Sequence, residues 1–272
     1  MRKETFNIIK FESINQGIDR YFPSQIESTG LWKDLLNLEQ FTQLLTKKLP
    51  LGKSRYGGAI VDFPKNTAFP DTKKWSFMAQ INLVEFKPYD KNNLLPKDGH
   101  LFFFMDMETD KGKTLFFEGN NQDLERFFIT ELDDIWGTLE VITNISSEHQ
   151  KWEANYQKLE KEELKCPICK KSNIMDCNCD ITGMFWHDRE DIIEKKYIWD
   201  ASENTYTSKM FGIYADVQCG EKEIEEVTFS DKIVLFQVGE DINDEGIFSV
   251  LIGKEDLKKL DFDKCTYRWS QT

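Results

Sequence analysis

The chain has 272 residues, a formal net charge of −13 and 40% hydrophobic residues. This composition suits one large domain or two small ones with a packed core, and it excludes wholesale disorder. Nucleic acids and anionic membranes require a cationic surface, so we expect neither as a partner. The longest apolar run, residues 101–105, is far shorter than a membrane span. The first residues carry no secretory signal, so we expect a cytoplasmic protein.

An apolar stripe in residues 31–49 predicts the first element, an amphipathic helix. Its apolar residues recur every three or four positions, the spacing of one helix face. Pro50 and Gly52 end this helix. The Lys- and Glu-rich residues 148–165 predict another helix, and residues 120–136 predict a short one between them.

Turn residues divide the segments 55–104 and 211–272 into short apolar runs, which predict β-strands. Residues 241–252 resemble the start of a calcium loop but lack its final glutamate, so we expect a β-hairpin turn at their beginning. The clearest strand candidates are residues 75–83, 101–105, 233–238 and 247–252.

The two strand-rich segments resemble each other. Residues 54–62 and 208–216 share a serine, a basic residue, a glycine and an aspartate at matching positions, and residues 77–82 align with 234–239. In both segments a glycine then opens the next apolar run. A period of roughly 155 residues is too long for a solenoid, so we expect an internal duplication into two β-rich halves.

Four cysteines within 14 residues form the most specific motif of the chain. Cys166 and Cys169 make a Cys-x-x-Cys pair, and Cys177 and Cys179 make a Cys-x-Cys pair. Each spacing turns two thiolates to one side. Four thiolates at tetrahedral corners make a closed structural zinc site. We therefore expect bound Zn²⁺ that stabilises this segment and does not activate water.

Three other interpretations of the motif remain: a thioredoxin-like redox pair, two disulfides and an iron–sulfur cluster. A redox pair opens a helix after a strand, disulfides are rare in a reducing cytoplasm, and the spacing fits no common cluster pattern. His187 is a candidate additional ligand or a group that contacts the ligands, although a surface histidine beside aromatic residues is the commoner explanation. Cys219 and Cys265 are isolated, and we expect buried free thiols.

No hydrolase or nucleotide-binding motif is present in the sequence. Four polar residues, Asp62, Gln80, Asp216 and Gln237, hold equivalent positions in the predicted repeat. A cleft between the two halves would present them in pairs, as a binding or catalytic site requires. Strand-end hydrogen bonding is the simpler role for all four.

The stretch from Ser54 to Gly58, two prolines at positions 64 and 70, and the string Ala-Gln-Ile-Asn at 79–82 resemble the YwqG-like family of bacterial proteins. Residues 209–212 and 256–262 are similar to it as well. The resemblance implies a mixed α and β fold with an internal duplication. Some members lie near polymorphic toxin genes, so it also implies an immunity role. It implies no catalytic residues.

Together these observations predict an α+β protein in which two related β-rich halves pack as one unit. We expect a single domain over 1–272, with halves at 50–145 and 200–272, an N-terminal helix and a zinc-binding insertion at 160–185. The expected function is that of a non-enzymatic intracellular binding protein, with an immunity protein that neutralises a toxin as the leading case. The acidic charge would steer it toward a cationic partner. The alternative is an enzyme or small-ligand-binding protein that uses a cleft between the halves.

Overall fold

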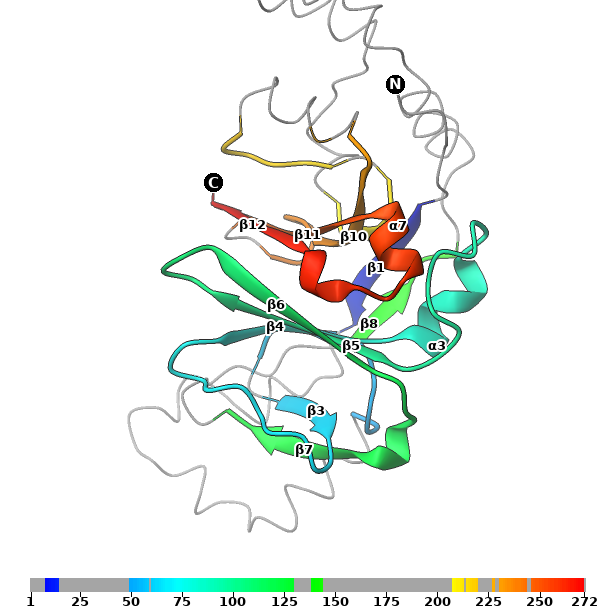
Figure 1. Ribbon diagram of the computed structural model, residues 1–272, viewed down its shortest axis with the longest axis vertical. Coiled ribbons are helices and arrows are strands. Elements are labelled where there is room, and N and C mark those ends of the chain that lie inside the picture. Colours follow the sequence, from blue (N-terminus) through cyan, green and yellow to red (C-terminus); the bar gives the residue numbers. More distant parts are fainter. Residues whose placement is uncertain are drawn as a thin grey trace, which may run out of the picture. The chain divides into compact units, whose positions relative to one another are not determined.

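The computed structural model divides the protein into two compact units (Figure 1). Unit 1 comprises Met1–Lys10, Thr143–Lys254 and Arg268–Thr272, and unit 2 comprises Phe11–Ile142 and Glu255–Tyr267. The structure describes residues 8–14, 49–58, 60–129, 138–143, 207–212, 214–219, 227, 230–243 and 246–271.

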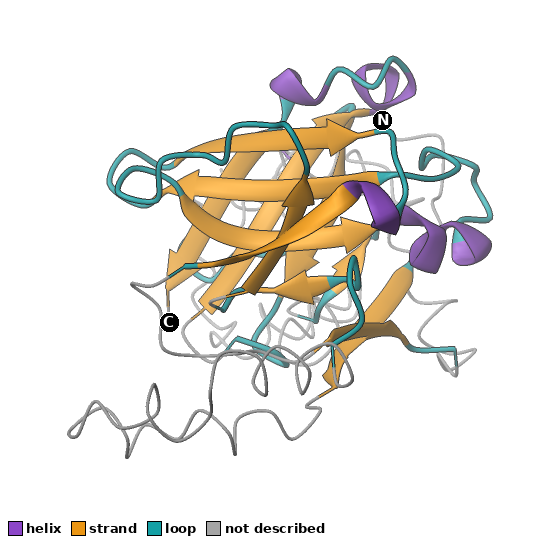
Figure 2. Ribbon diagram, turned by 90° about the horizontal axis from the view of Figure 1, so that it is seen from below, coloured by secondary structure: helices purple, strands orange, loops and turns teal. Residues whose placement is uncertain are grey.

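The regular secondary structure of the described residues is mostly β-strand (Figure 2), so the expected α+β class is wrong. Within these ranges the α-helices are short: α3 (Leu83–Phe86) has 4 residues and α7 (Lys254–Lys258) has 5. The helices predicted at 31–49 and 148–165 lie outside the described residues, apart from Leu49. No helix in the described part of the chain is long and apolar enough to cross a membrane.

Unit 2 contains an antiparallel sheet whose central strand, β5 (His100–Asp106), is buried on both faces. β4 (Ser76–Asn82) pairs with β5, which pairs with β6 (Lys111–Phe117). All seven residues of β5 are buried, which explains its continuous apolar run. On the other side of β4 follow β2 (Arg55–Tyr56), β8 (Thr138–Val141) and the second part of β1 (Ile9–Ile14).

A second layer of unit 2 is a two-stranded ribbon of β3 (Ile60–Pro64) and β7 (Leu124–Phe128) (Figure 1). The short helix predicted at 120–136 is therefore wrong, since its first apolar residues belong to β7. Pairing with β3 satisfies the β7 backbone, and the ribbon packs on β4 and β5 through one apolar cluster. At its centre the Phe63 ring lies 5.0 Å from the rings of both Phe69 and Phe102.

Unit 1 contains an antiparallel pair, β10 (Lys232–Val238) and β11 (Gly246–Gly253), as the apolar runs predict. The expected hairpin turn joins these two strands. β9 (Lys209–Met210) pairs with β10 and with the first residues of β1. β12 (Thr266–Gln271), of which the part from Arg268 onward belongs to this unit, follows β11 at the edge of the sheet.

The two units share local geometry at the positions that the sequence aligns. Arg55 pairs with Gln80 in unit 2, and Lys209 pairs with Gln237 in unit 1. The longer strand carries a register shift in both cases, between Phe77 and Ala79 and between Val234 and Phe236. These matched features favour the internal duplication, which itself stays a prediction.

Gly99 has a backbone conformation that only glycine adopts easily, so replacing it tests the turn that leads into β5. Its φ is +100°, and an added Cβ would lie 2.6 Å from the carbonyl oxygen of Phe117. We expect Gly99→Ala to lower the free energy of unfolding by about 3 kcal/mol through strain and overpacking. The exposed Lys97→Ala should change it by less than about 0.5 kcal/mol. Urea unfolding measures both, and equal midpoints would contradict the described turn.

Candidate functional site

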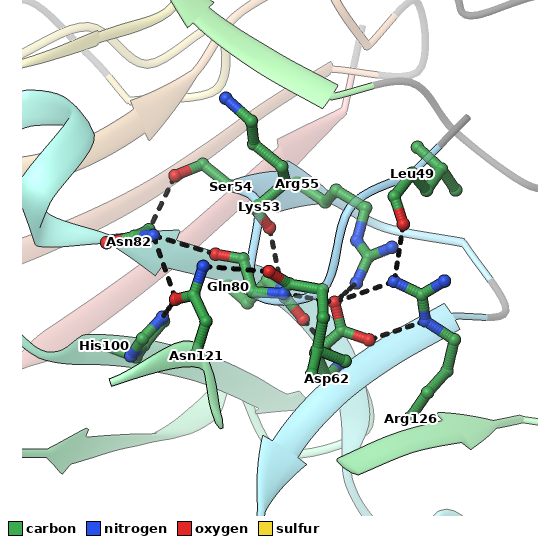
Figure 3. Close-up of polar contacts among 12 residues, drawn as sticks. Leu49, Lys53, Ser54, Arg55, Asp62, Gln80, Asn82, His100, Asn121 and Arg126 are labelled. Atoms are coloured by element: carbon green, nitrogen blue, oxygen red, sulfur yellow. Dashed lines mark hydrogen bonds and ion pairs between the residues drawn. The ribbon is translucent and has the colours of Figure 1, made fainter. Parts of the chain in front are cut away.

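Asp62, on β3, is the centre of a buried ion cluster in unit 2 (Figure 3). Its side chain is fully buried. Arg55 Nη2 donates to Oδ2 at 2.6 Å, and Arg126 donates from Nε to Oδ1 at 2.7 Å and from Nη2 to Oδ2 at 3.1 Å. The backbone N–H of Gly52 adds a hydrogen bond of 2.8 Å to Oδ2. The carboxylate thus accepts four hydrogen bonds.

The charges of this cluster determine its protonation. Burial disfavours the charged form of Asp62, but the Arg55 charge and the Arg126 hydrogen bond outweigh burial, and the pKa of Asp62 is lowered. Burial also lowers the pKa of Arg55, to about 10, while the Asp62 charge opposes this shift. Asp62 and Arg55 are therefore charged at neutral pH, and the cluster combines one carboxylate with two guanidinium groups.

A carboxylate in this state is a poor proton carrier. General acid or base catalysis is most efficient with a pKa near the working pH, whereas four hydrogen bonds hold the Asp62 carboxylate in its charged form. The cluster instead connects segments. Arg126 lies opposite Asp62 on β7 and also donates to the carbonyl oxygen of Leu49 at 2.9 Å. Asp62 and its arginines thus join β2, β3, β7 and the segment at 49–52.

Gln80 and Gln237 have matching structural roles in the two units. Gln80 accepts from the Asp62 backbone N–H at 2.8 Å and donates to the Lys53 carbonyl at 2.7 Å. Gln237 accepts from the Ala215 N–H at 3.2 Å and donates to the Thr207 carbonyl at 2.9 Å. Each glutamine therefore fastens its strand to two neighbouring segments by its side-chain amide.

Asp216 does not reproduce the environment of Asp62. It accepts a 2.5 Å hydrogen bond from the Tyr214 hydroxyl and further bonds from the backbone N–H groups of Gln218 and Cys219. This is a local turn that the aspartate side chain stabilises. The contact partner equivalent to Asp62 is Ala215, one position earlier, because Gln237 binds its N–H.

The four predicted cleft residues are thus divided between the units, with Asp62 and Gln80 in unit 2 and Asp216 and Gln237 in unit 1. Each is at most 4% exposed. Each makes its side-chain hydrogen bonds inside its own unit, which favours the simpler structural role. A cleft that presents both pairs together stays a prediction.

The predicted zinc ligands Cys166, Cys169, Cys177 and Cys179 and the candidate His187 lie outside the described residues. In the ranges that are described, no group of three or more His, Cys, Asp or Glu residues is arranged to hold a metal ion. The isolated Cys219 and Cys265 form no disulfide within the described residues and are half-buried. Burial raises the pKa of Cys265 to about 11, so it is protonated and unreactive at neutral pH.

Sequence reasoning missed a pocket in unit 2 with a volume of about 610 Å³. It forms where β4 ends, where β5 begins and where the 3₁₀ turn η4 (Asn121–Asp123) follows β6. The one available signal was a pair of polar residues, Asn82 and His100, which lie opposite each other on β4 and β5. Its lining residues are Asn82, Val84, Asp98, His100, Glu118, Gly119, Asn120, Asn121 and Gln122.

Polar side chains at this pocket hold one another in place (Figure 3). The Asn121 amide donates to the Leu51 carbonyl at 2.9 Å, and its Oδ1 lies 3.0 Å from His100 Nε2. The Asn82 amide donates to the Gly52 carbonyl at 3.0 Å and to Asn121 Oδ1 at 3.3 Å. The pocket and the ion cluster therefore share the segment at 51–52.

The Asp62 cluster predicts how much the free energy of unfolding falls when its carboxylate is removed. Asp62→Asn leaves the buried Arg55 and the partly buried Arg126 without their counter-ion, so we expect a loss of about 3–5 kcal/mol in the free energy of unfolding. Lys258→Met, which breaks the exposed pair with Glu255, should cost about 0.5 kcal/mol or less. Denaturant unfolding at neutral pH compares the two variants.

The same carboxylate also contributes to acid unfolding. Because the folded pKa of Asp62 is lowered, its contribution is complete above the unfolded value of about 3.9 and is lost as pH falls below it. Between about pH 6 and pH 2.5 the free energy of unfolding should therefore fall more steeply with decreasing pH in the wild type than in Asp62→Asn. Parallel curves, or a neutral-pH loss under about 1 kcal/mol, would contradict the assigned cluster.

Comparison with known proteins identifies the family of the chain. A search of curated proteins found no match. Residues 54–270 match a family model described as a domain of unknown function, DUF1963. The match includes the Asp62 cluster, the pocket and the strands β2 to β11. The chain therefore belongs to the DUF1963 family of domains of unknown function.

Proposed function

We propose that the chain is a non-enzymatic binding protein whose partner is a protein with a cationic surface. The observation that supports this most directly is the state of Asp62. This carboxylate is buried, ionised and held by four hydrogen bonds. Buried polar groups of this kind stabilise a rigid scaffold, and recognition then takes place on the surface that the scaffold presents.

The charge of the chain indicates the kind of partner. The sequence has 48 acidic against 35 basic residues, a net charge of −13. Such a field accelerates association with a positively charged surface and opposes association with nucleic acid. The acidic stretches at 221–226 and 240–245 are the candidate contact surfaces. Of these residues the structure describes 240–243, where Glu240 and Asp241 are exposed.

The resemblance to YwqG-like proteins is more specific than the DUF1963 match, and we retain it as part of this proposal. It suggests that the cationic partner is a toxin and that the chain acts as its immunity protein. Many toxin domains are nucleases, and a nuclease must carry positive charge where it binds phosphates. An acidic inhibitor that occupies this surface would exclude the substrate.

A structural zinc ion held by Cys166, Cys169, Cys177 and Cys179 is a second part of the proposal. Its support is the pairing and spacing of the four cysteines. A reducing compartment such as the cytoplasm would keep these thiolates available for metal. Such a site would stabilise its own segment and would leave recognition to the surrounding surface.

Zinc content tests the metal assignment. Protein purified without chelator should carry about one zinc ion per chain, and Cys177→Ser should lose it because three thiolates hold zinc less tightly. Cys219→Ser and Cys265→Ser, at the isolated cysteines, are the matched controls and should retain it. Plasma mass spectrometry measures the ratio. Wild-type protein with freely titrating thiols and little zinc would remove this part of the proposal.

Salt dependence tests the binding proposal. A protein captured from the native host should be basic, and its association rate should fall about tenfold between about 50 and 500 mM NaCl because exposed charges are screened. Glu240→Gln with Glu245→Gln should slow association, while Glu108→Gln with Glu125→Gln serves as the control on unit 2. Association that is independent of salt and of both pairs of substitutions would rule out electrostatic recognition.

A further inference from the structure

The geometry points to the unit 2 pocket as a binding site for an alkyl primary ammonium group. The group would come either from a lysine side chain of the protein partner or from a free aliphatic amine. The lysine source rests on the proposed function, whereas the site itself does not. Four features of the pocket favour such a ligand: its charge, its buried histidine, its size and its apolar edge.

The charges that line the pocket are all negative. Asp98 and Glu118 are exposed carboxylates, and the lining includes no lysine or arginine. In the described part of the chain neither carboxylate makes a hydrogen bond or ion pair. Two uncompensated carboxylates favour a cation and disfavour phosphate or carboxylate ligands.

His100 adds a hydrogen-bond acceptor without adding charge. The Asn121 amide group donates to the Leu51 carbonyl, so its oxygen faces His100 Nε2 and that nitrogen must carry the proton. Burial lowers the pKa of His100, although its hydrogen bond to Asn121, the backbone of Gly52 and Gly119 and the charge of Glu85 oppose the shift. The ring is therefore neutral at pH 7 and its Nδ1 is an acceptor.

Within the described residues this nitrogen makes no hydrogen bond. His100 is 1% exposed, and among the described residues its Nδ1 finds no hydrogen-bond donor. A buried polar atom left without a partner is costly. Because His100 lines the pocket, a ligand N–H group is the chemistry that would satisfy it.

A metal ion does not fit the same residues. Asp98, His100 and Glu118 are not arranged as a metal-binding group, and no such group occurs in the described ranges. The carboxylates therefore act on a ligand at longer range than coordination bonds. An ammonium group that donates to His100 Nδ1 and is attracted by both carboxylates meets this requirement.

The size and edge of the pocket favour an alkylammonium over the ammonium ion itself. A volume of about 610 Å³ exceeds what a single small cation needs. Val84, on α3, lines the pocket and is 58% exposed. Its side chain offers apolar contact to the methylene chain behind the charge, as lysine stems commonly find on protein surfaces.

Nitrogen NMR of the full chain, labelled with ¹⁵N-histidine, tests the site. The sequence has three histidines, and the signal that disappears in His100→Gln assigns His100. We expect n-butylammonium to shift the Nδ1 resonance of His100 saturably, because a donor then reaches this nitrogen. Butanol at the same concentration should not shift it. No saturable shift, or equal shifts with both probes, would overturn the proposal.

Carboxylate variants separate the pocket from general electrostatics. Asp98→Asn with Glu118→Gln should weaken n-butylammonium binding about tenfold. Glu108→Gln with Glu125→Gln removes the same charge elsewhere on unit 2 and should leave the affinity unchanged. Equal weakening by both pairs would mean that net charge, not this pocket, attracts the amine, and would overturn the proposal.

Two further ligands distinguish the sources of the ammonium group. A short peptide with one internal lysine that binds at least tenfold more tightly than n-butylammonium supports a partner lysine, and equal affinities support a free amine. The same peptide with acetylated lysine should not bind, and binding by that peptide would overturn the proposal. If the amine does not bind but a protein partner is still captured, the pocket assignment is wrong and the proposed function is retained. If the amine binds but no protein partner is captured, the proposed function is wrong and the pocket assignment is retained.

Discussion

The ion cluster around Asp62 is the interaction on which the described architecture of unit 2 depends. The β3–β7 ribbon has only two strands, and such a ribbon is marginal in water without further support. The ribbon packs on β4 and β5 through apolar side chains. Its position relative to β2 and the segment at 49–52 is defined by one carboxylate and two arginines. Buried ion pairs add little net stability when they are intact, but a single unpaired member is expensive. The cluster therefore favours one arrangement of these segments over compact alternatives.

The same logic explains why the sequence predicted some elements and not others. Residues 233–238, 247–252 and 101–105 are continuous apolar runs, and each became a buried strand because both of its faces are covered. The run at 124–128 misled because Leu124, Phe127 and Phe128 also fit one helical face. What decides between helix and strand there is pairing with β3, an interaction between segments some 60 residues apart that no local pattern carries.

The site was predicted even less completely, for a related reason. Asp62 and Gln80 were selected as repeat-equivalent polar residues, and the structure brings them together through the Asp62 N–H. Arg126, the second cation of the cluster, gave no signal because its partner is distant in the chain. The pocket was missed because it depends on register: Asn82 faces His100 only in the observed pairing of β4 with β5. A shift of one residue would direct these side chains to the opposite face.

The division of the chain between the two units has a consequence for biosynthesis. Glu255–Tyr267 belongs to unit 2, whose other residues precede Thr143, and the first strand contributes residues to both units. Tyr267 fills the space above Gly112 and bonds to Thr114, while Phe262 lies 5.4 Å from Phe116. A nascent chain therefore cannot cover this face of β6 until residues 255–267 have left the ribosome. Until then unit 2 is incomplete, and the apolar face of β6 is exposed where a chaperone would protect it.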